Sequence, residues 1–237
     1  MNQPLPYNEC IFCHLIARGP GQTWHEDGPG AIYEGRDLAI VPDLAPLTPH
    51  HVLIMSREHF FAMKSLGPQT RPQLALLKKG LRRFHEQEHG LQTLFFEHGS
   101  CSGYSGAACI AHAHLHAVPL SQKQLATVLS QTLKLLGPPN QTPMEADYLY
   151  AEFIEDNELY WPDSLNKRQF FRILVADALA NVDRAKWQNC ISGSELLTSR
   201  SWLKACVKSW NRFSVVSGDF LSDKGLNPDA VIRKHLR

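Results

Sequence analysis

The sequence has little that would place it in a membrane, in the secretory pathway or on a polyanion. No apolar run approaches the roughly 18 residues that a membrane-spanning helix needs. Residues 1–9 do not show the basic and then apolar layout of a signal peptide. The 24 basic and 23 acidic residues leave a formal net charge of +1, so no global field draws the chain to nucleic acid or to an anionic membrane. We therefore expect a cytoplasmic protein.

Cysteine is also scarce, because six cysteines in 237 residues are too few for a disulfide scaffold. Two of them form Cys10-Ile-Phe-Cys13, which in a reducing compartment indicates metal binding or redox chemistry. The length predicts one large domain or one domain with a substantial extension. With 43% hydrophobic and 20% charged residues, the composition is that of an ordinary globular protein.

Three histidines alternate with small or apolar residues between His112 and Leu120. Alternation with a period of two predicts a half-buried strand. On such a strand His112, His114 and His116 share one face, and the apolar residues between them share the other. Imidazoles repeated along one face can bind metal, attack as nucleophiles or relay protons. Three in register favour a functional site over a chance arrangement.

The rest of the chain predicts an α+β fold in two parts. Short apolar runs predict strands at 31–33, 38–41, 51–55, 93–97 and 112–120, and the period of the apolar residues predicts a helix from about 69 to 89. This order predicts a domain over residues 1–120 with an antiparallel sheet and helices on one side. Residues 121–237 predict a mixed α/β extension, packed on that domain, with helices at about 121–136, 167–181 and 201–212 and a hairpin at 148–161.

The motifs resemble those of the histidine triad superfamily. His112-Ala-His-Leu-His-Ala-Val is similar to the family's His-φ-His-φ-His-φ-φ motif, where φ is an apolar residue. Upstream, Cys10-Ile-Phe-Cys-His, Val41-Pro-Asp-Leu-Ala-Pro, Pro49-His-His-Val-Leu-Ile and Ser56-Arg-Glu-His follow in family order. The resemblance covers roughly residues 10–120, so it implies a histidine triad fold for that part of the chain.

The resemblance implies a nucleotide hydrolase or nucleotidyl transferase. In that family the middle histidine, here His114, forms a covalent nucleotidyl-histidine intermediate. His116 would contact the phosphate or the leaving-group oxygen, and His51 matches a fourth histidine near the triad. Distant uridylyltransferases have glutamine at the position of His116, so the hydrolase branch is the better match. The substrate would be a nucleoside phosphoramidate, a dinucleoside polyphosphate or a related nucleotide.

The resemblance also implies a structural zinc site. In zinc-bearing relatives the cysteine pair, here Cys10 and Cys13, is completed by the histidines at the positions of His59 and His112. Four sulfur and nitrogen ligands suit tetrahedral zinc and close the site to substrate. One zinc ion per chain would then tie the N-terminal segment to the histidine strand.

The resemblance also implies a nucleoside pocket. It involves four further positions and a loop that departs from the family pattern. Asp43 matches the acidic residue that binds the ribose hydroxyls, and Phe12, Leu15 and Leu44 match apolar positions around the base. Many relatives carry Gly-Gly-Gln-Ser before the triad, where this chain has Gly106-Ala-Ala-Cys109. In the segment from Gly106 to Cys109, backbone amides rather than side chains would bind phosphate.

Three alternatives stay open. Histidines two residues apart on a strand also suit a zinc-dependent hydrolase, although no His-x-His-x-Asp pattern accompanies them. The altered loop favours a nucleotide-binding module with little turnover. Activity on nucleic-acid ends is disfavoured by the balanced charge. We expect a nucleotide substrate and neither a membrane nor a nucleic-acid partner, and we leave a homodimer open.

Two basic clusters lie in the extension. Lys167, Arg168 and Arg172 gather near Gln169 at the start of a predicted helix, where we expect a solvated basic face rather than a contact to a leaving phosphate. Basic residues also recur every four positions from Arg200 to Arg212, opposite a tryptophan-rich apolar face. This second pattern predicts a helix that packs on the catalytic domain with its basic stripe in water.

Overall fold

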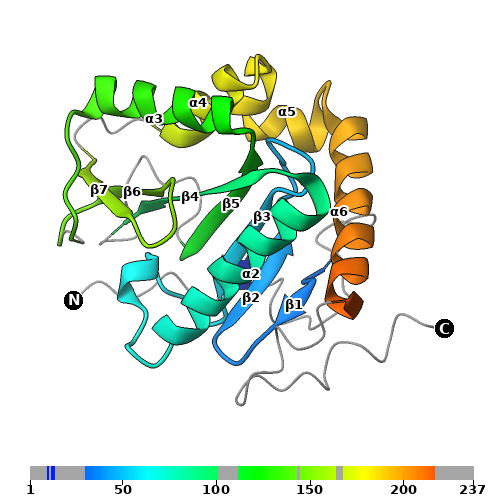
Figure 1. The fold of residues 1–237 in the computed structure, drawn as a ribbon, viewed down its shortest axis with the longest axis horizontal. Coiled ribbons are helices and arrows are strands. Elements are labelled where there is room, and N and C mark those ends of the chain that lie inside the picture. The colour runs from blue at the N-terminus through cyan, green and yellow to red at the C-terminus, as the bar shows by residue number, and fades with distance from the viewer. Residues whose placement is uncertain are drawn as a thin grey trace.

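The computed structural model describes residues 10, 12–13, 30–100, 112–142, 145–163 and 168–216. Seven strands of these residues form one antiparallel sheet in the order β1-β2-β3-β5-β4-β6-β7 (Figure 1). The strands are β1 (Tyr33–Glu34), β2 (Leu38–Pro42), β3 (Val52–Ser56), β4 (Gln92–Gly99), β5 (His114–Leu120), β6 (Tyr148–Glu152) and β7 (Glu158–Pro162). The α+β class and the antiparallel sheet predicted from the sequence are confirmed.

The histidine strand β5 begins two residues later than predicted. It starts at His114, and His112 lies in the bend before it. The backbone N–H of Ala113 donates to the Phe60 carbonyl at 2.6 Å, and the Ala113 carbonyl accepts from Ser56 N–H at 3.2 Å. The approach to the strand is therefore bonded partly to the loop after β3. As predicted, Leu115 and Ala117 enter the apolar core on the opposite face of the strand.

The helices and 3-10 turns are η2 (Met63–Ser65), α2 (Arg71–His89), α3 (Gln122–Leu136), α4 (Phe170–Ala178), η3 (Val182–Ala185), α5 (Trp187–Ser192) and α6 (Leu196–Val216). The predicted capping box is present, because Ser121 and Gln124 bond each other's backbone N–H groups at the start of α3. Helix α4 is shorter than predicted at both ends. It begins after Gln169, whose φ of 58° is left-handed.

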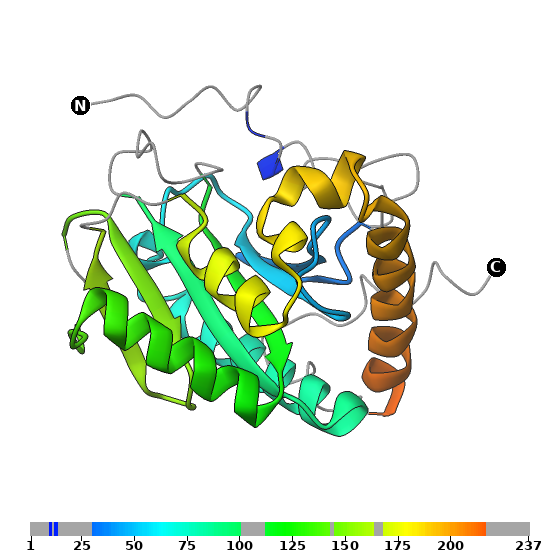
Figure 2. The ribbon, with the colours of Figure 1, turned by 90° about the horizontal axis from the view of Figure 1, so that it is seen from above.

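Helices cover both faces of the sheet (Figures 1 and 2). On one face, Leu77, Leu81 and Phe84 of α2 pack with α6 residues against Leu115 and its neighbours. On the other face, α3 and α4 pack on β4 and β5 in a second core. The N-terminal part thus has its helix α2 on one side, as predicted, and the extension adds helices to both sides.

The sheet continues across residue 120. Strand β6 pairs with β4, with Phe96 opposite Ala151, so the predicted hairpin joins the same sheet as the histidine strand. Residues before and after position 120 therefore share backbone hydrogen bonds as well as a core. No helix of the described residues is both long and apolar enough to cross a membrane.

Candidate active site and metal centre

Two cysteines and two histidines meet at the start of the histidine strand. The possible ligand atoms of Cys10, Cys13, His59 and His112 lie within 4.8 Å of one another. The Sγ atoms of Cys10 and Cys13 are each 3.5 Å from His112 Nδ1, and Cys13 Sγ is 3.1 Å from His59 Nδ1. Tetrahedral zinc, with bonds of about 2.3 Å to sulfur and 2.0–2.1 Å to nitrogen, would separate such ligands by about 3.5 Å. The geometry therefore fits a metal ion.

The surroundings of His112 also suit a metal ligand. Its Nε2 is 2.7 Å from the Ser56 carbonyl oxygen, so we assign the ring proton to Nε2 and a lone pair to Nδ1, which faces the sulfurs. Burial lowers the pKa of His112 to about 4, which keeps the ring neutral. Burial, and then the neighbouring Cys10, raises the pKa of the Cys13 thiol to about 12. Two thiolates in this place therefore call for a cation between them.

His114 is held in the tautomer that a nucleophile needs. Its Nδ1 lies 2.6 Å from the His112 carbonyl oxygen, so Nδ1 carries the proton and Nε2 a lone pair. This Nε2 has no hydrogen-bond partner among the residues that the structure describes. Phe12 contacts the ring edge-on with centroids 5.3 Å apart, and burial holds the pKa of His114 below its ordinary value. The imidazole is thus neutral, oriented and half-buried.

His51 and His116 form a hydrogen-bonded pair beside His114. The backbone N–H of Leu47 donates to His51 Nδ1 at 3.1 Å, which leaves the His51 proton on Nε2. That Nε2 lies 3.0 Å from His116 Nδ1, so His116 accepts there and carries its own proton on Nε2. Phe96 stacks on the His116 ring with centroids 4.4 Å apart. The predicted fourth histidine is therefore next to the triad, and His116 offers a donor.

Asp43 lies beside this pair but is already hydrogen-bonded. Its Oδ1 accepts from Ala45 N–H at 2.9 Å, and its Oδ2 accepts from Arg172 Nη1 at 3.1 Å. The same Oδ2 is 3.4 Å from His51 Nδ1 and 3.7 Å from His116 Nδ1. Ribose binding by Asp43 stays a prediction, and it would have to compete with these internal contacts.

Arg172 is the contributor to this site that sequence reasoning missed. We expected a solvated basic face, but the Arg172 side chain is buried and contacts Asp43, so that interpretation is wrong for this residue. The available signal was its place inside the apolar run Phe170-Phe-Arg-Ile-Leu-Val. Oxygen and nitrogen atoms of Asp43, His51 and His116 are also close enough to hold a cation. The guanidinium at 3.1 Å from the carboxylate disfavours one.

The other predicted pocket residues are less informative. Phe12 is buried against His112 and His114. Leu44 is half-buried next to Asp43 in the chain. Leu15 and Cys109, with the loop from Gly106, lie outside the described residues. The nucleotide roles of all these positions therefore remain predictions.

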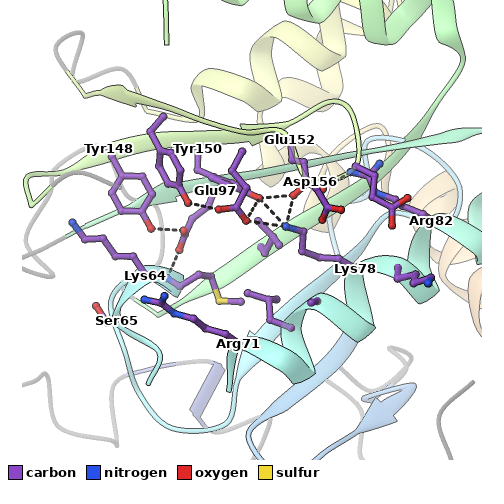
Figure 3. Close-up of a pocket in the computed structure, with 18 of the residues that line it drawn as sticks. Lys64, Ser65, Arg71, Lys78, Arg82, Glu97, Tyr148, Tyr150, Glu152 and Asp156 are labelled. Carbon is purple, nitrogen blue, oxygen red and sulfur yellow. Dashed lines mark hydrogen bonds and ion pairs between the residues drawn. The ribbon is translucent and has the colours of Figure 1, made fainter. Parts of the chain in front are cut away.

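A separate cavity of about 830 Å³ lies on the other face of the sheet, between α2 and the β6–β7 hairpin (Figure 3). Several polar groups that line the cavity form hydrogen bonds or ion pairs with one another. Tyr148 OH donates to Glu97 Oε2 at 2.6 Å, and Met63 N–H donates to Glu97 Oε1 at 2.7 Å. Tyr150 donates to Glu152, which also forms ion pairs with Lys78 and Arg82. These groups hold the hairpin to α2 and lie away from the histidine face.

Comparisons with known proteins agree with the sequence motifs. Residues 36–132 match the family model described as "Protein similar to CwfJ C-terminal". The chain is 26% identical over 113 residues to Protein HitA of Neisseria gonorrhoeae, which covers 46% of this chain and 94% of HitA. It is also 26% identical over 169 residues to zinc finger CCCH domain-containing protein 59 of Oryza sativa subsp. japonica, which covers 61% of this chain.

The alignment with the rice zinc finger protein spans only 26% of that protein's length. Among solved structures, a zinc-bound histidine triad family protein from Mycobacterium smegmatis aligns with a TM-score of 0.38 and 18% identity, over 76% of this chain and 99% of that one. The chain is similar in sequence to HitA and to the CwfJ C-terminal family model, and its motifs resemble those of histidine triad proteins.

Proposed function

We propose that this protein cleaves or transfers a nucleotidyl group, with His114 as the nucleophile. The observation that carries the proposal is the orientation of His114, whose Nδ1–H is bound by the His112 carbonyl while its Nε2 lone pair has no partner among the described residues. A neutral imidazole held in this way can attack phosphorus, and a covalent intermediate divides one difficult displacement into two easier ones.

His116 is the hydrogen-bond donor to the leaving group in this proposal. As Nε2 of His114 forms its bond to phosphorus, the bond from phosphorus to the leaving oxygen or nitrogen breaks with its electron pair. The Nε2–H of His116 donates a hydrogen bond to that leaving atom, which departs with the electron pair and takes a proton from water, and His51 holds the opposite nitrogen of the ring at 3.0 Å. Water or another acceptor then attacks the phosphorus and loses its proton to solvent, and the phosphorus–nitrogen bond breaks with its electron pair returning to His114 Nε2.

We also infer that Cys10, Cys13, His59 and His112 hold one zinc ion. The separations of 3.1–3.5 Å between sulfur and nitrogen atoms and the mixed sulfur and nitrogen donors support zinc. With four protein ligands, the ion would supply a structural link and would leave no open coordination position. Because His112 also provides the carbonyl that orients His114, the metal centre and the nucleophile are joined through one residue.

The test is to trap the intermediate. Purified protein is mixed with labelled nucleoside phosphoramidates, dinucleoside polyphosphates or nucleotide sugars and then quenched. We expect an acid-labile phosphorus–nitrogen label on the protein for the best substrate class. His114→Ala should carry no label and lose turnover by about 10⁶-fold, as other nucleophile substitutions do. His89→Ala on α2 is the control and should keep both.

Two outcomes would contradict the proposal. If His114→Ala kept most of the rate, the nucleophile would be wrong and a metal-dependent hydrolase would be favoured. If nucleotides bound with neither label nor turnover, the chain would be a nucleotide-binding module.

A further inference from the structure

Arg172 of α4 reaches the loop between β2 and β3, which carries Asp43. Besides its bond to Asp43, Arg172 donates from Nη2 to the Ala45 carbonyl at 2.7 Å and to the Arg184 carbonyl at 3.1 Å. The side chain of Arg172 is only 7% exposed. One buried guanidinium therefore ties the extension to two groups of the loop, the carboxylate of Asp43 and the backbone carbonyl of Ala45.

Arg184 of η3 supports the same loop at Pro46, the residue after Ala45. Its side chain is fully buried, and its Nη1 donates to the Pro46 carbonyl at 2.6 Å. Its Nη2 pairs with Glu195 at 2.6 Å, and its guanidinium lies 3.9 Å from the centre of the Trp202 ring. The two arginines thus hold the carbonyls of Ala45 and Pro46, immediately before Leu47.

Leu47 is the residue whose N–H sets the tautomer of His51. That N–H donates to His51 Nδ1 at 3.1 Å, and His51 in turn donates to His116 at 3.0 Å. A shift of the loop would release Nδ1 and permit the other tautomer, which would point a lone pair rather than a proton at His116. Loop position and His116 orientation are therefore connected by a chain of hydrogen bonds.

We propose that Arg172 is a positioning residue of the histidine site. It holds the 43–47 loop, and through Leu47 and Asp43 it sets the tautomer and charge of His51 and His116. The role of His116 as a donor rests on the proposed function above, whereas the tautomers are properties of the protein alone. In this proposal residues beyond position 120 complete a site whose histidines all come from the first half of the chain.

The charges around the pair give Arg172 a second effect. Asp43 lies beside both rings. Arg172 and His114 also act on both, and the buried His85 of α2 acts on His51. Burial first, and then the neighbouring imidazoles and the Arg172 guanidinium, hold the pKa values of His51 and His116 well below the ordinary range. Without Arg172, the Asp43 carboxylate would be unpaired and would favour imidazolium rings.

The experiment compares Arg172→Gln with the wild type by ¹⁵N spectra of the imidazoles across pH. The wild type should show His51 and His116 neutral with the proton on Nε2. In Arg172→Gln we expect the titration of this pair to move up by about one pH unit or more, and the fixed tautomers to become mixtures. Arg36→Gln, which breaks an exposed pair with Asp37, is the matched control and should change nothing.

Turnover supplies a second readout. On a substrate that the protein turns over, Arg172→Gln should lower kcat about 10-fold or more with KM nearly unchanged, because a positioning group acts on the reacting histidines. Asp43→Asn combined with Arg172→Gln removes the unpaired carboxylate and should return the titration toward the wild-type range. Should Arg172→Gln fail to fold, this double variant and Arg172→Lys, which keeps the charge but not the planar fork, test the same point.

Unchanged histidine spectra in a folded Arg172→Gln protein would overturn the proposal, whatever the activity. A protein with no turnover on any nucleotide but with the expected spectral change would overturn the proposed function and leave the role of Arg172 standing.

Discussion

At His112, His114 and His116, identical side chains are held by different hydrogen-bond partners. The Ser56 carbonyl binds His112 Nε2, the His112 carbonyl binds His114 Nδ1, and His51 binds His116 Nδ1. These contacts place the ring proton on Nε2 in His112 and His116 and on Nδ1 in His114, so the first ring turns a lone pair toward sulfur, His114 offers a lone pair and His116 offers an N–H group. The hydrogen-bond partner of each ring therefore determines which of its nitrogen atoms carries the proton.

Substitutions at adjacent histidines should separate metal binding from catalysis. We expect His112→Ala to lose zinc and to lower the free energy of unfolding by about 4 kcal/mol or more, since it removes a metal ligand. His114→Ala should keep one zinc per chain, because His114 is not among the four clustered ligands. Elemental analysis and chemical denaturation measure both. Wild-type protein free of metal and indifferent to chelators would contradict the site.

Glu97 should make stability fall as pH rises. Burial raises its pKa from 4.5 to about 7, although Tyr148 and Met63 N–H partly offset this. Between these values the unfolded chain ionises while the folded state keeps its proton, so stability present below pH 4.5 is lost by about pH 7. The full effect is about 3 kcal/mol.

The measurement is the pH dependence of unfolding in Glu97→Gln, which should lose this part of the slope. Glu155→Gln, at an exposed position on the same cavity, is the control and should leave the curve as in the wild type. Identical slopes in wild type and Glu97→Gln would contradict the prediction.

At the scale of elements, α6 is attached to α2 by aromatic side chains. Trp210 and Phe213 contact Phe84 with ring centroids 5.2 and 5.4 Å apart. Lys204, Lys208 and Arg212 on the other side are exposed, and Arg212 forms an ion pair with Glu88. The predicted arrangement, apolar face inward and basic stripe in water, is observed at these three residues, whereas Arg200 at the start of the predicted stripe is half-buried.

Trp210→Ala should therefore weaken the docking of α6. Trp210 is only 2% exposed, and removal of such a side chain costs about 3–5 kcal/mol because a cavity is left behind. Leu197→Ala on the same helix is the control, since Leu197 is 76% exposed and should cost less than about 0.5 kcal/mol. Thermal or urea unfolding gives both values. Equal effects would show that α6 is not docked through Trp210.

At the scale of the whole molecule, the extension is part of the architecture around the site. Strand β6 covers the edge of β4, α3 and α4 cover Leu94, Phe96 and Val118, and Arg172 enters the histidine site. A chain truncated after Leu120 would expose an unpaired strand edge and an apolar sheet face.

We accordingly expect residues 1–120 alone to be aggregated or poorly folded. Size-exclusion chromatography and the dispersion of amide NMR signals measure this, with the full chain as the reference. A monomeric fragment that unfolds cooperatively would show instead that residues 1–120 form an independent domain.

Much of the fold followed from the sequence because its signals are local. Alternation placed His114 and His116 on one face of β5, an apolar period predicted α2, and Ser121 with Gln124 predicted the start of α3. Each signal lies within a few residues and does not depend on what the element packs against. The family resemblance added the ligand set that the structure brings together.

Only the tertiary structure decided how these parts act on one another. Asp43 and Arg172 are 129 positions apart, and their contact depends on how α4 packs on the sheet. The same is true of the pairing of β6 with β4 and of the Leu47 N–H that orients His51. A buried charge is stable only where a partner meets it, and that partner is chosen by packing rather than by neighbouring sequence. For this reason the sequence pattern predicted that Arg172 lies at the surface, whereas in the structure it lies in the histidine site.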